Sequence, residues 1–216
     1  MIRARPLPAN LVQRYHGWRA TTFAESRAWF RTLAEKGQRP RAMVIGCCDS
    51  RVLISQIFGA EPGEFFVHRN IAGLVPPFDP GGDLHGTSAA VEYAVETLEV
   101  PQVIVLGHSL CGGVRGCHDM CAGLAPHLQE RSSFVGRWME LLRPGYERVA
   151  GIEDEDERLR ALEREAVLLS LANLATFPFV ARRLECDDLS LHGIWTDIGD
   201  GALHGWDPER GAFVPL

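Results

Sequence analysis

The chain has 216 residues, enough for one sizeable hydrophobic core, and its 46% hydrophobic and 23% charged residues are the balance of a globular protein. A formal net charge of −6 without a dense block of Lys and Arg argues against a nucleic-acid-binding protein. No apolar run approaches the ~20 residues that a membrane-spanning helix needs, so we expect no membrane partner. Residues 1–24 lack a continuous apolar segment, which argues against a secretory signal, but they also lack acidic residues, which leaves an organelle-transit segment open.

The first elements are helical. Residues 10–36 have helical periodicity with a break near "RATT", and "KGQRP" ends that segment with glycine and proline. Two strands follow: "AMVIG" at 42–46, an apolar run typical of a strand buried on both faces, and "EFFVHRN" at 64–70. We therefore expect one domain over residues 1–216 whose first 36 residues form an N-terminal helical arm.

Strands and helices then alternate. A Pro/Gly-rich loop at 71–86 leads to a predicted helix at 87–100, capped by Thr87 or Ser88, and "QVIVLGH" is a third buried strand. The remaining predicted elements are helices near 126–145 and 155–185, the second kinked or ended by Pro178, a strand at 189–197, a turn and a hairpin partner at 202–207. This order predicts an α/β fold, a mainly parallel β-sheet flanked by helices.

One charged run lies at the start of the last long helix. The segment "EDEDERLRALERE" has an acidic first turn that suits the helix dipole, and we interpret the run as a solvated helix face.

The six cysteines do not form the pattern of a disulfide framework in a chain of this length. Without a signal peptide a reducing compartment is favoured, so we expect a cytoplasmic protein with free thiols. Such thiols pack, react or bind a metal.

Two polar motifs stand where buried strands end. "CCDSR" follows the first strand and "HSLCGG" follows the third, and in parallel sheets ligands bind at the carboxyl ends of strands. In an extended segment Cys47, Asp49 and Arg51 share one side, and a helical turn in "HSLC" would put His108 and Cys111 on one face. Two sulfurs and one nitrogen match an open zinc site with a fourth position for water or substrate.

The charges in the first motif suggest separate roles. A centre of Zn²⁺, two thiolates and a neutral His acidifies water less than a three-His site does, so a neighbouring base would help. Asp49 can accept a hydrogen bond and orient that water, provided that a bidentate pair with Arg51 holds its carboxylate off the metal.

These motifs resemble those of the β-class carbonic anhydrases, C-x-D-S-R followed by H-x-x-C. The similarity covers roughly residues 30–120, including "FFVHRNIAGLV" and "AAVEYAVETLEVPQVIVLGH", and extends more loosely to "LHGIWTDIGDG". The resemblance implies one Zn²⁺ per chain held by Cys47, His108 and Cys111, and a catalytic dyad of Asp49 and Arg51. It also implies attack of zinc-bound hydroxide on CO₂ to give bicarbonate and a proton, and a homodimer or a dimer of dimers.

Further residues are assigned by the same resemblance. Gln38 matches a glutamine that binds bicarbonate across a dimer interface, and Phe66, Ile71 and Tyr93 match positions that line the apolar CO₂ pocket. Gly112, from the glycine pair after Cys111, would permit close approach of the backbone near the metal and is assigned to substrate binding.

One regulatory feature of the family is not matched. Some members carry a non-catalytic bicarbonate site built on a Trp, an Arg and a Tyr, and here these positions are Val44, Arg69 and Thr196. We therefore expect this type of bicarbonate inhibition to be weak or absent.

Several other residues have a functional and a structural interpretation. Cys48 is the rival ligand to Cys47, although strand alternation puts it on the opposite side. Cys117 and Cys121 suggest either a second metal site or, more simply, helix packing. The remaining candidates are Cys186, taken as structural, His68 and Arg69, which either react or hold the loop, and His85 and His127 as proton relays.

Three other functions compete with CO₂ hydration. Carbonyl sulfide or carbon disulfide hydrolysis uses the same scaffold and zinc motif in related enzymes. A structural zinc module normally has four Cys or His ligands, whereas only three are assigned here. A redox dithiol protein would need a C-x-x-C motif, which is absent from the sequence.

Overall fold

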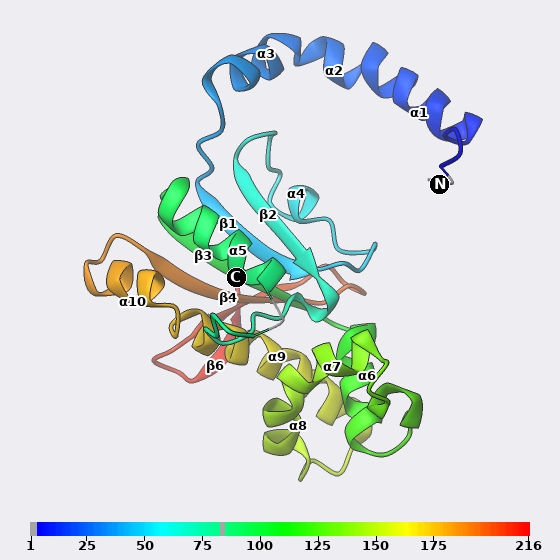
Figure 1. Ribbon diagram of the computed structural model, residues 1–216, viewed down its shortest axis with the longest axis vertical. Helices are drawn as coiled ribbons and strands as arrows, with labels where there is room; N and C mark the ends of the chain where they lie inside the picture. Colours follow the sequence, from blue (N-terminus) through cyan, green and yellow to red (C-terminus); the bar gives the residue numbers. More distant parts are fainter. Residues whose placement is uncertain (1–3, 83–84) are drawn as a thin grey trace. The chain divides into compact units, whose positions relative to one another are not determined.

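The structure is a computed structural model that describes residues 4–82 and 85–216 (Figure 1). The chain divides into two compact units, Met1–Gln38 and Arg39–Leu216. The smaller unit corresponds to the predicted helical arm, and the larger one holds the sheet and both motifs. The prediction of a single domain over 1–216 stays a prediction.

The N-terminal unit consists of three consecutive helices, α1 (Ala9–Ala20), α2 (Thr22–Glu25) and α3 (Arg27–Lys36). The predicted break lies at Thr21, where the backbone leaves helical geometry, and α3 ends at Gly37 with a positive φ that favours glycine. None of the three helices has a buried residue among those described, and Trp18 packs on Phe23 and Phe30 while remaining 43% exposed. The unit therefore has little core of its own, and its aromatic rings pack on one another.

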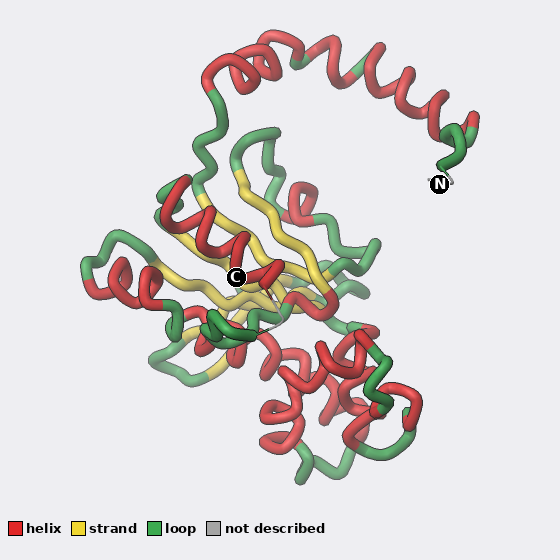
Figure 2. Tube along the Cα trace, in the orientation of Figure 1, coloured by secondary structure: helices red, strands yellow, loops and turns green. Residues whose placement is uncertain are grey.

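The larger unit is built on one six-stranded sheet in the order β2-β1-β3-β4-β5-β6. Figure 2 shows the strands of this sheet in yellow. The strands are β1 (Ala42–Cys47), β2 (Phe65–Asn70), β3 (Gln102–His108), β4 (Ser190–Thr196), β5 (Leu203–Asp207) and β6 (Ala212–Pro215). The first four run parallel, and β5 and β6 are added antiparallel at one edge. The predicted α/β fold with a mainly parallel sheet is confirmed. β6 was not predicted, because four residues are too few to show an alternation.

Helices of different length cover the two faces of the sheet. On one face Met43, Ile45 and Val103 pack against α5 (His85–Glu92), the π-helical turn η2 (Tyr93–Thr97), α9 (Glu155–Leu174) and α10 (Pro178–Glu185). On the other, Val44 and Leu106 pack with the short helix α4 (Ile54–Ile57). Because alternate residues of β1 enter different cores, both sides of this strand are apolar, as the run "AMVIG" predicted.

A helical cluster forms a third core at the carboxyl ends of the parallel strands (Figure 1). Its elements are the short turn η1 (Ile71–Gly73), α6 (Gly112–Cys121), η3 (Pro126–Gln129), α7 (Phe134–Met139), η4 (Glu140–Leu142), α8 (Arg143–Val149) and the first half of α9. The prediction of one helix over 126–145 was wrong. Ser133 caps α7 by accepting a hydrogen bond from the Gly136 N–H, and Pro144 opens α8, so the chain turns twice within that range.

The expected break of the 155–185 helix near Pro178 is confirmed, whereas the expected cap of the 87–100 helix is not. The predicted 155–185 helix ends at Leu174, and Pro178 starts α10 at its first turn, where a proline needs no N–H donor. Thr87 does not cap α5; it lies inside the helix and is buried. Within 4–82 and 85–216 no single helix has the length and hydropathy of a membrane span, and only α9 and α10 together, bent by 86°, reach that limit.

Candidate metal centre

The first two candidate ligands come from neighbouring strands. Cys47 is the last residue of β1 and His108 is the last residue of β3, and these strands pair in parallel with Gly46 beside Leu106. The carboxyl ends of both strands therefore meet at one edge of the sheet, as the motifs predicted. Both residues are buried.

Cys111 reaches the same place by a route that the sequence did not predict. No helical turn connects His108 to Cys111; Leu110 has a positive φ of 56°, and α6 begins only at Gly112. The left-handed residue reverses the chain so that Cys111 returns towards His108. The expected helical spacing was wrong, whereas the expected convergence of the two residues is present.

The three ligand atoms form a compact group. They lie within 4.8 Å of one another, with 3.9 Å between the sulfurs of Cys47 and Cys111, and all three residues are at least 95% buried. Asp49 is not part of this group. Two sulfurs and an imidazole in this space are the donor set that zinc prefers for an open site.

His108 supplies the most specific observation for a metal. Its Nδ1 lies 2.9 Å from the Ser109 carbonyl oxygen. Because a carbonyl can only accept, Nδ1 is the donor, and Nε2 of the neutral ring carries the lone pair. That Nε2 is buried and finds no hydrogen-bond partner among the described residues. A buried acceptor normally has a partner, so the donor set and this bare nitrogen together fit a metal ion.

The two thiols influence each other's ionisation. The hydrogen bond with Cys111 lowers the pKa of Cys47, although burial opposes this, and the same hydrogen bond raises the pKa of Cys111. One sulfur of the pair is thus favoured as a thiolate before any metal binds, and metal binding would displace the remaining proton.

Asp49 and Arg51 form the pair that the sequence predicted. Arg51 Nε and Nη2 donate to the two carboxylate oxygens of Asp49 at 3.0 and 2.7 Å, and the Arg51 backbone N–H donates at 2.9 Å. Arg51 holds the pKa of Asp49 well below its usual range, so this carboxylate is ionised at neutral pH. Arg51 also donates to the Leu110 carbonyl at 3.0 Å, which links the two motif loops directly.

Arg69 of β2 stabilises the loop that follows β1. Its guanidinium donates to the backbone carbonyls of Cys47, Asp49 and Val52 at 2.7, 2.6 and 2.9 Å. Of the two interpretations of Arg69, the geometry therefore favours the structural one. Its donors are used within the loop, and the expectation that bicarbonate inhibition is weak or absent stays a prediction.

The residues assigned to substrate binding in the larger unit do not line one cavity. Phe66 and Tyr93 pack with ring centroids 5.7 Å apart, whereas Ile71 lines a cavity of about 870 Å³ and Gly112 lines a separate cavity of about 390 Å³. Gln38 ends the N-terminal unit. The roles of these five residues stay predictions.

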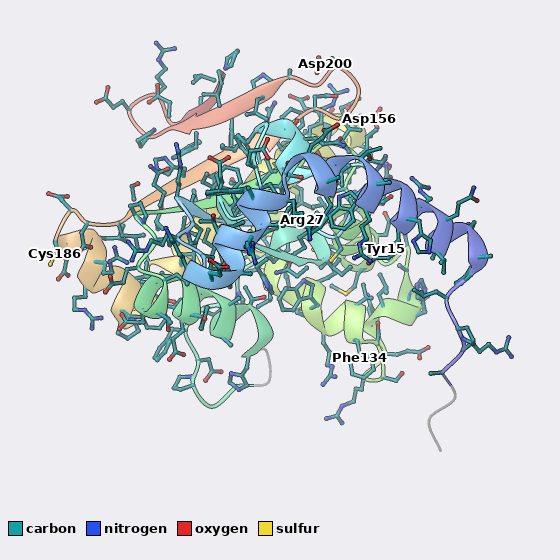
Figure 3. The ribbon with its side chains drawn as sticks, turned by 90° about the horizontal axis from the view of Figure 1, so that it is seen from above. Tyr15, Arg27, Phe134, Asp156, Cys186 and Asp200 are labelled. Atoms are coloured by element: carbon teal, nitrogen blue, oxygen red, sulfur yellow. The ribbon has the colours of Figure 1, made fainter. Side chains whose placement is uncertain are left out.

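The rival thiols are placed differently from the three candidate ligands. Cys48 is exposed and lines the 870 Å³ cavity, together with His68 and His85. Cys117 is buried in the helical core, which raises the pKa of its thiol, and the described residues offer no other metal-ligand cluster than Cys47, His108 and Cys111. Cys186 is exposed at the end of α10 (Figure 3). A second metal site at Cys117 and Cys121 finds no support.

The sequence reasoning missed Glu163. This residue lies in the run that we interpreted as a solvated helix face, but it is only 4% exposed and accepts hydrogen bonds from the Cys111 N–H and the Trp195 indole, both at 3.3 Å. Burial raises its pKa. Leu159 and Leu162 in the same run are buried as well, and this apolar spacing was the available signal.

Comparisons with known proteins agree with this site. Residues 42–203 match the model of the family described as "Carbonic anhydrase". Beta carbonic anhydrase 3 of Arabidopsis thaliana is 32% identical over 194 residues, covering 88% of this chain and 73% of that protein. The mitochondrial beta carbonic anhydrase 6 of the same plant is 37% identical over 172 residues, covering 78% of this chain and 57% of that protein.

Solved structures give the same result. The β-carbonic anhydrase CcaA superposes with a TM-score of 0.87 at 33% identity, covering 96% of this chain and 91% of that one. A tetrameric β-carbonic anhydrase of the ascomycete Sordaria macrospora gives a TM-score of 0.78 at 30% identity, covering 95% of this chain and 97% of that one. The protein belongs to the β-class carbonic anhydrases.

Proposed function

We propose that this protein catalyses the reversible hydration of CO₂ to bicarbonate and a proton, with one zinc ion per chain. Membership of the β-class carbonic anhydrases supports the reaction. The observation that carries the zinc assignment is the buried, unpartnered Nε2 of His108 beside two thiols 3.9 Å apart. Bound between Cys47, His108 and Cys111, zinc would act as a Lewis acid that makes water a stronger acid and hence a better nucleophile.

The chain's own residues would prepare that water. The Asp49 carboxylate, ionised and fixed by Arg51, accepts two hydrogen bonds at Oδ1 and one at Oδ2, so Oδ2 can still orient the attacking water by accepting its hydrogen bond. Arg51 prevents Asp49 from turning onto the metal and closing the site. His108 is kept in the correct tautomer by the Ser109 carbonyl.

CO₂ itself would be held by apolar surface. Ile71, Phe66 and Tyr93 supply that surface, and the amide of Gln38 would bind bicarbonate. Because Phe66 and Tyr93 lie apart from the cavity that Ile71 lines, we propose that two chains together complete one substrate pocket.

A second copy of the chain is therefore part of the proposal, as a homodimer or a dimer of dimers. The outer position of β2 in the sheet supports it, because edge strands favour association. The tetrameric relative agrees with such assembly. Light scattering of the purified protein would test it, and a monomer at every concentration would contradict it.

The experiment that tests the function combines zinc content with stopped-flow CO₂ hydration, over roughly pH 6.5 to 9, on protein purified with reductant. We expect about one zinc per chain and hydration that increases towards alkaline pH, since a thiolate-rich centre leaves water less acidic. Asp49→Ala should retain zinc and lose turnover. Unchanged turnover of this variant would overturn the mechanism and favour a structural zinc module.

The same assay separates the related hydrolase activity. Carbonyl sulfide or carbon disulfide would be offered in place of CO₂ and sulfide release followed. Fast sulfide release with negligible CO₂ turnover would replace our proposal with that alternative.

We also propose a cytoplasmic location. The free state of all six cysteines supports it, and fractionation of cells that express the tagged protein would test it.

A further inference from the structure

Glu163 is a buried carboxylate that the proposed reaction does not use. It lies in the middle of α9, is 4% exposed, and forms no ion pair with any residue in the described part of the chain. Burying a carboxylate without a cation is costly unless its oxygens are hydrogen-bonded. Its contacts therefore indicate why the fold retains it.

Both oxygens of Glu163 accept hydrogen bonds. Oε1 accepts from the backbone N–H of Cys111 and Oε2 accepts from Nε1 of Trp195, each at 3.3 Å. Trp195 is 3% exposed and lies on β4 directly beside Gly107 of β3. The indole thus fixes one oxygen, and the other is aimed at the residue that supplies the third candidate ligand.

The close packing of α9 on the sheet makes this contact possible. A Cβ atom added to Gly107 would lie 2.6 Å from Val167 Cγ2 and 3.4 Å from the Glu163 carbonyl oxygen. The missing side chain lets the backbone of α9 approach the end of β3, one residue before His108. Glu163 reaches the loop after His108 from there.

That loop is held at each of its residues. The Ser109 N–H donates to Thr196 and its hydroxyl accepts from Ile198, while the Leu110 carbonyl accepts from Arg51. The N–H of Cys111 is bound by Glu163. This last contact is made by a side chain to the backbone N–H of a ligand residue, while the Cys111 carbonyl accepts from the Arg115 N–H within α6. The Glu163 contact therefore acts on the orientation of the Cys111 backbone and hence of its Sγ.

We propose that Glu163 is a positioning residue of the metal centre: aimed by Trp195, it holds the Cys111 N–H and thereby points the Cys111 sulfur at the space shared with Cys47 and His108. The inference rests on the proposed function, because it assumes that these three residues bind zinc. It concerns metal affinity and geometry rather than contact with the substrate.

The direct test is Glu163→Gln, measured by competition of the zinc-loaded protein with a chelator. Glutamine has the same shape but only one acceptor oxygen, so its NH₂ group must face either the Cys111 N–H or the indole N–H. We expect zinc affinity to fall about 10- to 100-fold. In cobalt-substituted protein, the thiolate-to-cobalt absorption bands should change in position or intensity.

A matched control separates positioning from general stability. Ser170→Ala alters another buried polar side chain of α9. The Ser170 hydroxyl accepts a hydrogen bond of 3.2 Å from the Val75 N–H and makes no hydrogen bond with the described residues of the metal loop. We expect it to lower stability while leaving zinc affinity and the cobalt spectrum unchanged. If Glu163→Gln does not fold, Trp195→Phe removes the indole N–H that binds Glu163, together with part of a buried ring, and should weaken zinc binding by a smaller factor, about 3- to 10-fold.

A measurement on metal-free protein makes the outcomes distinct. The Cys111 amide proton should exchange slowly in the parent and faster in Glu163→Gln, whether or not zinc is present. The inference would be overturned, with the proposed function left standing, by either of two results. One is that Glu163→Gln binds zinc as tightly as the parent, and the other is that Ser170→Ala loses as much zinc affinity as Glu163→Gln. A parent protein that binds no zinc would overturn the proposed function and the inference together.

Discussion

The two loops that bring sulfur to the metal centre are supported in different ways. The loop after β1 is held by its own motif and by the next strand along the chain: Arg51 binds Asp49 two residues away, and Arg69 of β2 binds the carbonyls of Cys47, Asp49 and Val52. The loop after β3 depends on distant parts of the chain, namely Glu163 of α9 and the segment that follows β4. The first loop is therefore locally specified, and the second is specified by the tertiary fold.

Because the two loops are supported differently, substitutions in them should affect metal binding and stability in different ways. Arg51 bonds both loops, through the Asp49 carboxylate and the Leu110 carbonyl, and the thiols of Cys47 and Cys111 form a second contact between them. Substitutions in the first loop should act mainly through the chemistry of the motif. Substitutions around the second should act through the position of Cys111.

The largest effect on zinc binding and turnover is expected when the candidate ligand Cys47 is removed and the adjacent Cys48 is kept. Cys47→Ala should lose zinc and reduce CO₂ hydration by at least about a thousandfold, because two remaining donors do not hold an open zinc site. Cys48→Ala is the matched control, since Cys48 is exposed and outside the ligand group. Zinc content and stopped-flow rates measure both. A Cys48→Ala protein that lost its zinc would mean that we have assigned the wrong thiol.

A smaller effect is expected from the link between the loops. Arg51→Ala removes the group that holds the pKa of Asp49 low, so this pKa should rise towards its usual value while the carboxylate becomes free to turn. We expect zinc to be retained and turnover to fall about a hundredfold. Arg51→Lys keeps the charge without the bidentate geometry and should be intermediate. Full activity in Arg51→Ala would show that Asp49 needs no partner.

The sequence predicted the locally specified parts of the molecule and missed the remote ones. Alternation of buried strands with helices is visible in apolar runs, so the parallel sheet and the strand-end positions of Cys47 and His108 followed from the pattern. The left-handed turn at Leu110 was not predictable, because leucine gives no signal for a positive φ. The apolar spacing of Leu159 and Leu162 marked a buried side of α9, but the contact of Glu163 with the metal loop depends on the packing of α9 against Gly107, which no local pattern shows.

The support of the first loop should be measurable as folding stability. Arg69→Ala leaves three buried or partly buried carbonyls without their donor and should lower the free energy of unfolding by about 2–3 kcal/mol. Arg41→Ala is the control, because Arg41 makes only an exposed ion pair with Glu64 at 3.6 Å, worth about 0.5 kcal/mol or less. Urea unfolding of metal-free protein gives both values. Equal stability of the two variants would contradict a supporting role for Arg69.

The smallest effect concerns the strained turn of the second loop. Leu110 is 71% exposed, so replacing its side chain loses little apolar burial, and its φ of 56° costs a non-glycine residue about 1 kcal/mol. Leu110→Gly relieves this strain but makes the unfolded chain more flexible, and the two terms should nearly cancel, within about 0.5 kcal/mol. Leu110→Val adds a β-branched residue to the left-handed conformation and should cost about 1 kcal/mol or more. Urea unfolding compares the pair: a valine variant as stable as the glycine variant would show that the turn does not impose its geometry on Cys111.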